Sequence, residues 1–163
     1  MVSETLKCIA FTVFPLLFSF YNASIVTQPK NVEWYDSLHK PWFNPPKWLF
    51  APVWTTLYVL MGYASFLIYS DIQSQKVKSD FGYTPLLVYL VQLLLNWSWV
   101  PVFFALHLLA DSALLLAALL LLIFLTFYLF YKINPDAAYL LIPYIAWSSF
   151  ACYLNFTLFR LNK

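Results

Sequence analysis

Charged residues are scarce in this sequence. Asp, Glu, Lys and Arg make up 10% of the 163 residues and hydrophobic residues 63%, whereas a soluble domain carries about 25% charged residues. Too few charges remain to cover a water-exposed surface, so the composition excludes an ordinary soluble domain. The formal net charge of +2 is small and scattered along the chain, so we expect no nucleic-acid partner.

Residues that bind metals, form disulfides or carry out catalysis are also few. Cys8 and Cys152 are the two cysteines, and each stands alone in an apolar run, so neither a structural disulfide nor a zinc site is expected. His39 and His107 lie at the edges of connecting segments, where an interfacial side chain is favoured over a haem ligand. The sequence contains no Ser-His-Asp arrangement, paired acids or phosphate-binding loop. We therefore expect no metal, no required cofactor and no classical catalytic site.

Long uncharged segments, in contrast, are abundant. Each comes close to the roughly 20 residues that an α-helix needs to cross about 30 Å of hydrocarbon. The first is not expected to be a cleaved signal peptide, because Glu4 and Lys7 precede it in place of a basic leader. The sequence therefore predicts an all-α integral membrane protein with a single domain over residues 1–163. Its five transmembrane helices are expected at residues 8–26, 48–70, 81–106, 112–131 and 137–159.

The connection over residues 27–47 is long enough to have structure of its own. Residues 31–38 predict a short interfacial helix with Asn31 as its cap. Pro41, Pro45 and Pro46 follow, and they stiffen the chain just before the second span. We expect this segment to form a lid over the bundle.

Two features of the spans bear on how they pack. Four spans contain a proline, which removes a backbone hydrogen bond and predicts a kink. The fourth span is almost purely aliphatic over residues 114–125, which indicates a helix that faces lipid, and its Ala113 and Ala117 form a weak small-xxx-small pair. The four prolines are Pro15, Pro52, Pro101 and Pro143.

No charged residue falls inside the five uncharged segments. Ion pumps and proton-coupled transporters usually keep charged groups within the membrane, because those groups couple to the ion. The polar groups here are neutral, and most are interpreted as hydrogen-bonding links between helices. Asn96 is different, because Trp97 and Trp99 flank it, and an amide between large rings can fix the polar end of a ligand.

Aromatic residues make up 21% of the chain. Trp54 and Tyr58 share one face of the second span, and Trp147, Ala151 and Asn155 follow helical spacing on the fifth. Such stripes fit either an aromatic core without a ligand or a pocket for a flat apolar molecule. Because the stiff loop can close such a pocket, we favour the pocket.

Several motifs resemble those of a known family. The first connection and second span carry Trp34-Tyr35-x-x-Leu38-x-Lys40-Pro41, Pro45-Pro46-x-Trp48 and Pro52-Val53-Trp54-x-Thr56-Leu57-Tyr58. The later spans carry Gln92-Leu93-x-Leu95-Asn96-Trp97-x-Trp99-x-Pro101, Pro143-Tyr144-x-Ala146-Trp147 and Leu154-Asn155. Over nearly its whole length the chain resembles the translocator protein family, also called TspO/MBR, tryptophan-rich sensory proteins or peripheral-type benzodiazepine receptors.

The resemblance implies a membrane receptor that binds porphyrins such as protoporphyrin IX and haem-related tetrapyrroles, sterols and synthetic aromatic drugs. Its implied role is tetrapyrrole or cholesterol transport, or sensing. The implied location is the outer mitochondrial membrane if the chain is eukaryotic, and a bacterial membrane otherwise. The implied pocket residues are Ala23, Val26, Tyr35, Pro45, Ala51, Val53, Trp54, Asn96, Trp99, Trp147, Ala151 and Leu154, and the implied sterol contacts are Leu154, Phe156 and Arg160.

Two alternatives stay open. The resemblance extends to bacterial proteins that degrade porphyrins in light, and there Trp54 and Trp147 would be the aromatic pair beside the tetrapyrrole. The other alternative is a homodimer or larger oligomeric scaffold that packs through the fourth span at Ala113 and Ala117.

At Phe156 the chain departs from the sterol pattern, which has a tyrosine there.

Overall fold

The computed structural model describes residues 3–74 and 82–163 as a bundle of α-helices, with no strand in these two ranges. Five helical stretches are long and apolar enough to cross a membrane, which confirms the all-α fold with five spans. They cover Glu4–Val26, Lys47–Gln73, Thr84–Ala105, Leu109–Tyr131 and Pro135–Leu161.

Several of the five spans are divided into shorter helical segments, and the first connection contains a further helix. They are α1 (Glu4–Val13), η1 (Phe14–Leu16), α2 (Leu17–Val26), α3 (Pro29–Ser37), α4 (Lys47–Gln73), α5 (Thr84–Val100), η2 (Pro101–Ala105), α6 (Leu109–Tyr131), α7 (Pro135–Tyr139) and α8 (Ile142–Leu161). The expected start of the third span, Phe81, lies outside the described residues.

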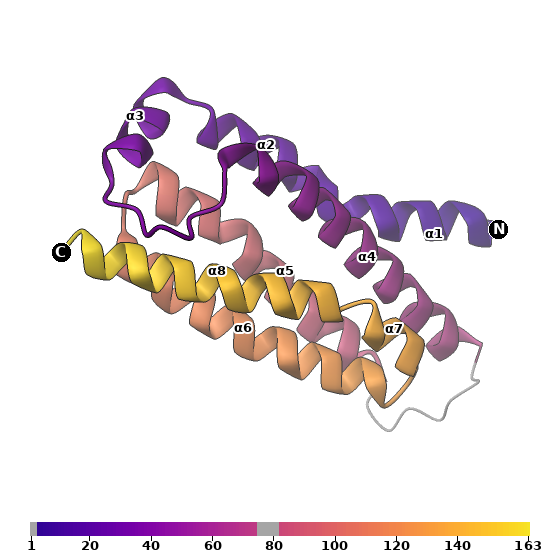
Figure 1. Ribbon diagram of the computed structural model, residues 1–163. Helices are drawn as coiled ribbons and strands as arrows, with labels where there is room; N and C mark the ends of the chain where they lie inside the picture. The colour runs from indigo at the N-terminus through magenta and orange to yellow at the C-terminus, as the bar shows by residue number, and fades with distance from the viewer. Residues whose placement is uncertain (1–2, 75–81) are drawn as a thin grey trace.

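The spans lie side by side, with α6 against both α5 and α8, α1 against α4, and α2 against α5 (Figure 1). The short helix α3 and the loop after it lie at the end of the bundle where α8 finishes (Figure 1). This end is therefore covered by chain from the first connection, as the sequence predicts for a lid.

Three of the four predicted proline kinks coincide with interruptions of regular α-helix. Pro15 lies in the 3₁₀ turn between α1 and α2, and Pro101 opens the π-helical segment after α5. Pro143 lies in the first turn of α8, just after the break that separates α8 from α7. Pro52 differs, since α4 continues through it. The fifth span is consequently two helices rather than one.

The expectation that the fourth span faces lipid holds for only one of its faces, on which Leu114 and Leu121 are exposed. Leu116, Leu119 and Ile123 of α6 are almost fully buried in the main core. Of the most apolar stretch of α6, 39% is buried, the same share as in α4, against 17% in the span formed by α1 and α2. An all-aliphatic helix has no polar face to mark its orientation, and lipid is as apolar as a core. Its sequence alone therefore could not show which side is buried.

The predicted cap of the interfacial helix is also wrong. The helix α3 starts at Pro29 after Gln28, whose side chain makes no capping bond. Asn31 is fully buried inside the first turn, and its Nδ2 donates to the carbonyl oxygen of Ile25 at 2.7 Å. Its Oδ1 lies 3.3 Å from Nε2 of His107, whose ring stacks on Trp34. Asn31 thus connects α3 to α2 and to the segment after η2.

Gly62 allows α1 and α4 to approach each other closely. A Cβ atom at this position would lie 2.6 Å from the backbone oxygen of Phe11 and 2.8 Å from the Cα of Thr12. No side chain fits at that distance without moving backbone, so glycine is needed here because of packing.

Candidate functional site

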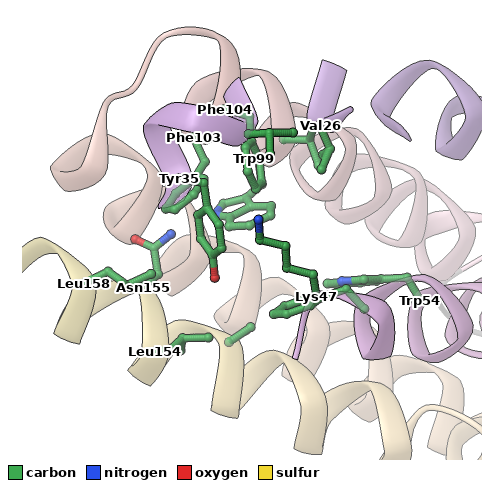
Figure 2. A pocket seen from close by; sticks show the side chains of 14 residues that line it. Val26, Tyr35, Lys47, Trp54, Trp99, Phe103, Phe104, Leu154, Asn155 and Leu158 are labelled. Atoms are coloured by element: carbon green, nitrogen blue, oxygen red, sulfur yellow. The ribbon is translucent and has the colours of Figure 1, made fainter. Parts of the chain in front are cut away.

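An apolar chamber lies beneath α3, between α4, α5 with η2, and α8. Its volume is about 180 Å³. Figure 2 shows side chains from all of these elements pointing toward one another around it. The chamber is lined by Val26, Val32, Tyr35, Lys47, Phe50, Trp54, Trp99, Val100, Phe103, Phe104, Ala151, Leu154, Asn155 and Leu158.

Aromatic rings from the third span form one wall of the chamber. The ring of Trp99 stacks on that of Phe103, with 5.0 Å between centroids and 24° between planes. Phe104 packs edge-on against Phe103 at 4.8 Å. The π-helical turn that follows Pro101 carries both phenylalanines, and such turns are frequent at functional sites. The local break at Pro101 therefore lies in the chamber wall.

The wall opposite comes from one face of α8. Ala151, Leu154, Asn155 and Leu158 follow i, i+3, i+4 and i+7 spacing, so they share a single stripe of the helix. Ala151 is the smallest of them and leaves room within the chamber. The stripe on the fifth span therefore continues from Ala151 toward the C-terminal end of α8, which α3 covers.

Two buried N–H groups at the chamber have no hydrogen-bond partner. They are Nε1 of Trp99 and Nδ2 of Asn155. Asn155 is only 2% exposed, and its Oδ1 accepts a hydrogen bond from Oγ of Ser112 at 3.2 Å. A buried donor left unpaired costs about 1–3 kcal/mol. Both groups are therefore available to donate to a polar acceptor on a molecule inside the chamber.

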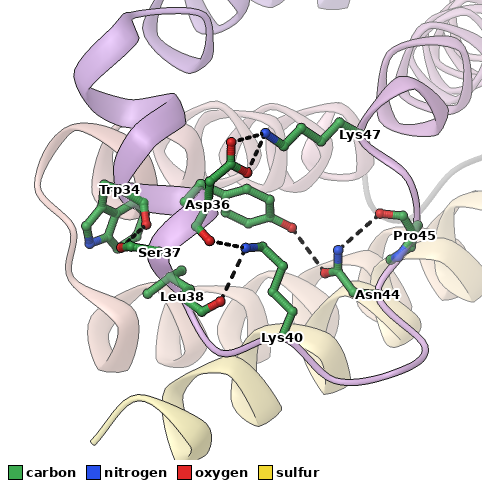
Figure 3. Close-up of polar contacts among 9 residues, drawn as sticks. Trp34, Asp36, Ser37, Leu38, Lys40, Asn44, Pro45 and Lys47 are labelled. Atoms are coloured by element: carbon green, nitrogen blue, oxygen red, sulfur yellow. Dashed lines mark hydrogen bonds and ion pairs between the residues drawn. The ribbon is translucent and has the colours of Figure 1, made fainter.

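The helix α3 and the loop that follows it form the roof of the chamber, and charged and polar side chains hold this roof in place. Figure 3 shows Lys47 of α4 paired with Asp36 of α3, with Nζ at 2.5 and 2.7 Å from the two carboxylate oxygens. The hydroxyl of Tyr35 donates to Oδ1 of Asn44 at 3.1 Å. The hydrogen bond from Lys47 lowers the pKa of Asp36, so the carboxylate stays ionised at neutral pH. Burial raises the pKa of Tyr35, which stays neutral.

The loop after α3 is also attached to the end of α8. The backbone N–H of His39 donates to Oδ1 of Asn162 at 2.8 Å, and Nδ2 of Asn162 donates to the His39 carbonyl at 3.0 Å. Phe43 stacks on Tyr153 with 5.4 Å between ring centroids. The roof is therefore attached to both α4 and α8, by contacts that are mostly exposed to solvent.

Half of the residues expected in the pocket line this chamber. They are Val26, Tyr35, Trp54, Trp99, Ala151 and Leu154. Ala23 and Ala51 are instead exposed on the outside of their helices, and Val53 and Pro45 are half-buried away from the lining. Pro45 belongs to the roof, where its carbonyl accepts a hydrogen bond from Asn44.

Asn96 lies outside the chamber lining, in the centre of the bundle. Its Oδ1 accepts from the hydroxyl of Tyr58 at 2.6 Å, and its Nδ2 donates to the hydroxyl of Tyr144 at 3.0 Å. The Tyr144 hydroxyl in turn donates to Oε1 of Gln92 at 2.9 Å. We call these four residues the central network. Asn96 therefore links α5 to α4 and α8, whereas its flanking tryptophans predict that it fixes the polar end of a ligand.

Trp147 is separated from the chamber by one aromatic side chain. Its indole packs edge-on against Phe50, a lining residue, at 5.8 Å between ring centroids. Trp54 lines the chamber directly and packs against Tyr58 and Tyr144. The two tryptophans therefore do not face each other across the chamber as an adjacent pair.

The three expected sterol contacts are divided between two surfaces. Leu154 is buried at the chamber, whereas Phe156 and Arg160 are exposed on the outer side of α8. Phe156 lines a second hollow, a groove of about 640 Å³ between α6 and α8 that also contains Ala113, Ala117 and Tyr153.

Sequence reasoning missed part of the lining. Asn155 lies on the predicted stripe of the fifth span, and its i+4 spacing from Ala151 is the signal that could have placed it in the lining. Lys47 ends the predicted first connection, and a charge beside an apolar chamber leaves no periodic pattern that could mark it as a lining residue. The other missed lining residues are Val32, Phe50, Val100, Phe103, Phe104 and Leu158.

Comparisons with known proteins agree on one family. The sequence model of the TspO/MBR family matches residues 11–161. The chain is 36% identical over 163 residues to a translocator protein from Sus scrofa, covering 100% of this chain and 94% of that one. It is 36% identical over 166 residues to a translocator protein from Homo sapiens, covering 99% and 94%. It is 35% identical over 130 residues to a tryptophan-rich sensory protein from Cereibacter sphaeroides, covering 80% and 77%.

Proposed function

The chain belongs to the TspO/MBR family of multi-pass membrane proteins, and from this premise we propose that it is a receptor whose chamber binds flat apolar ligands. The ligands are porphyrins such as protoporphyrin IX, sterols and synthetic aromatic drugs, and the output is their transport or sensing. The proposed location is the outer mitochondrial membrane in a eukaryote and a bacterial membrane otherwise. The observation that carries the proposal is the ring-lined chamber with two unpaired N–H donors.

The chemistry of the lining fits a flat ring system with a few polar atoms. Stacked or edge-on aromatic contacts contribute about 0.5–1.5 kcal/mol each beyond the area they bury. Nε1 of Trp99 and Nδ2 of Asn155 can each donate to a carbonyl or ring nitrogen of the ligand. A ligand that accepts these bonds removes the cost of leaving both donors unpaired, which favours it over a pure hydrocarbon.

The size of the chamber implies that the roof moves when a large ligand binds. Its volume of about 180 Å³ is below the roughly 300–1,000 Å³ of typical ligand pockets. The bonds that hold the roof, between Asp36 and Lys47 and between His39 and Asn162, are exposed. Exposed ion pairs contribute only about 0–1 kcal/mol, so ligand burial can offset their loss. A tetrapyrrole would then bind by induced fit, with α3 displaced.

Quenching of tryptophan fluorescence by protoporphyrin IX in lipid nanodiscs tests the proposal. We expect saturable quenching, because Trp54 and Trp99 line the chamber. Ala151→Phe fills the chamber and should weaken binding by about 10-fold or more, the equivalent of about 1.4 kcal/mol. Ala118→Phe adds the same ring on an exposed face of α6 and serves as the matched control. Absence of saturable quenching, or equal binding by both variants, would reject the chamber as the site.

Light-driven degradation of the bound porphyrin is a second candidate, favoured by the position of Trp54. The centroid of its ring lies 5.7 Å from that of Tyr58 and 6.2 Å from that of Tyr144, so this indole of the chamber wall contacts two further aromatic rings. The reaction would consume dissolved dioxygen as the oxidant of the illuminated porphyrin. Illumination should then give a new absorbing product that is lost in Trp54→Phe and in Trp147→Phe. An unchanged porphyrin spectrum would leave binding alone.

Self-association through α6 and α8 is a third candidate, favoured by the groove between them. Ala113 and Ala117 line this groove, and small residues allow a helix of a second copy to approach closely. Replacing both by leucine should disperse a homodimer in detergent, as measured by light scattering, while porphyrin affinity stays unchanged. A dimer that survives both replacements would contradict this interface.

A further inference from the structure

Lys47 brings a positive charge to an otherwise uncharged chamber. Of the 14 residues that line it, Lys47 is the one with an ionisable ammonium group. Figure 2 shows its side chain reaching toward Tyr35, and its Nζ lies 5.8 Å from the centre of the Tyr35 ring. The apolar stem of Lys47 therefore follows the wall while its charge stays at the roof.

Positive charge around Tyr35 exceeds the charge that Asp36 supplies. Nζ of Lys40 lies 4.8 Å from the centre of the same ring, and it donates to the backbone carbonyls of Asp36 and Leu38 rather than to a carboxylate. Lys47 is also the first residue of α4, where no side chain caps the helix. The uncapped N–H groups of a helix start carry a partial positive charge. Two ammonium groups and a helix start thus face one carboxylate (Figure 3).

We propose that the chamber selects apolar ring ligands that carry a carboxylate, and that this carboxylate takes the place of Asp36 on Lys47. The proposal rests on the proposed function and names its ligand class. Dicarboxylic tetrapyrroles belong to this class. Sterols and neutral aromatic drugs still enter the chamber, but they lack the acid and are expected to bind less tightly. The exchange breaks the ion pair between α3 and α4, so recognition of the acid also releases one attachment of the roof.

The exchange is physically reasonable because the pair it breaks is weak. The side chains of Lys47 and Asp36 are 55% and 52% exposed, so water screens their attraction. A ligand carboxylate is held close to Lys47 by the ring buried below it, and it adjoins the apolar lining, where the local dielectric is lower. The ligand acid therefore competes effectively with Asp36 for the same ammonium.

Protoporphyrin IX and its dimethyl ester test the inference, because they share one ring system and differ in their carboxylates. Both are titrated by fluorescence quenching into the full-length protein in nanodiscs of zwitterionic lipid. We expect the acid to bind the unmodified protein about 10-fold more tightly, as for one additional charge-assisted hydrogen bond. Lys47→Met should remove this preference, so that acid and ester bind with equal affinity. Lys47→Arg should keep it.

Asp36→Asn provides a test with the opposite sign. It removes the competing carboxylate, so the acid should bind about 3-fold or more tightly than to the unmodified protein, within the range of exposed ion pairs. Lys132→Met removes a charge at the end of α6 that lies away from the roof, and it should change the affinity for neither ligand. Ester binding in each variant shows that the chamber is intact.

The outcomes separate the inference from the function on which it rests. Equal affinity of the unmodified protein for acid and ester, or equal weakening of both by Lys47→Met, would overturn the inference and leave the receptor function standing. Binding of neither ligand would overturn the proposed function and the inference with it. A preference for the acid that Lys132→Met abolishes as strongly as Lys47→Met would assign the effect to net charge and overturn the role of Lys47.

Discussion

The central network and the chamber use similar residues in opposite ways. In the central network, Tyr58, Asn96, Tyr144 and Gln92 pair with one another, and the helices around them are tightly packed. In the chamber, Trp99 and Asn155 keep unpaired N–H donors at the cavity wall. An amide whose oxygen and N–H group are both paired stabilises the fold, whereas an unpaired N–H group beside a cavity is available for a ligand. The contrast shows why residue type alone does not identify a binding site in this bundle.

The largest expected effect is on stability and follows from breaking the central network. Asn96→Leu leaves the hydroxyl of Tyr58 without its acceptor and that of Tyr144 without its donor. Each unpaired buried group costs about 1–3 kcal/mol, so we expect a loss of about 3 kcal/mol in unfolding free energy. Thermal unfolding in detergent measures it. Unchanged stability with lost porphyrin binding would place Asn96 in the ligand site and reverse the contrast.

Gly62 tests whether the region around α1 and α4 is as tightly packed as its geometry indicates. Gly62→Ala forces the Cβ against the backbone of Phe11 and Thr12, and overpacking of this kind costs about 1–3 kcal/mol. Thermal unfolding should show the loss, with porphyrin affinity unchanged because neither helix segment lines the chamber there. Gly82→Ala is the control for steric crowding, because a Cβ added there would meet no atom within 4 Å beyond its chain neighbours. Its φ of +50° adds backbone strain, which is a separate effect. A stable Gly62→Ala variant would mean that α1 packs loosely.

Asn155 is the counterpart of Asn96 in the chamber, and its replacement should lower porphyrin affinity rather than stability. Asn155→Leu removes the unpaired Nδ2 donor, while Oγ of Ser112 keeps its second acceptor, the carbonyl of Leu109. We expect stability to change by less than about 1 kcal/mol and porphyrin affinity to fall by about 5- to 10-fold, the value of one hydrogen bond. Quenching titrations and thermal unfolding on the same sample separate the two. A large loss of stability would make Asn155 a second structural amide.

The smallest effect is expected at the attachment of the roof to α8. Asn162→Ala removes the two exposed bonds with the His39 backbone, and it should lower stability by about 0.5–1 kcal/mol. Because the roof is then held less firmly, porphyrin should associate faster in stopped-flow quenching. Thr157→Ala, on the same helix away from the chamber lining, is the control. Equal association rates in both variants would show that this attachment does not limit ligand entry.

The sequence by itself determined the class of the molecule and much of its outline. The uncharged segments predicted five spans, because hydropathy acts locally, and the resemblance to the family implied a pocket with Trp54, Trp99, Ala151 and Leu154 in its lining. Tertiary structure decided what each polar group does. Asn96 and Asn155 both lie on buried helix faces, and only the positions of Tyr58 and Tyr144 show that one amide is paired while the other faces a cavity.

The buried side of α6, the division of the fifth span and the position of Lys47 at the roof likewise depended on contacts between segments. An aliphatic helix carries no mark of its inner face when lipid and core are equally apolar. A lysine at the start of a span is compatible with either water or a chamber until α3 and Asp36 are placed above it. Hydrophobic length sets the number of spans, whereas pairing and close packing across helices set the site.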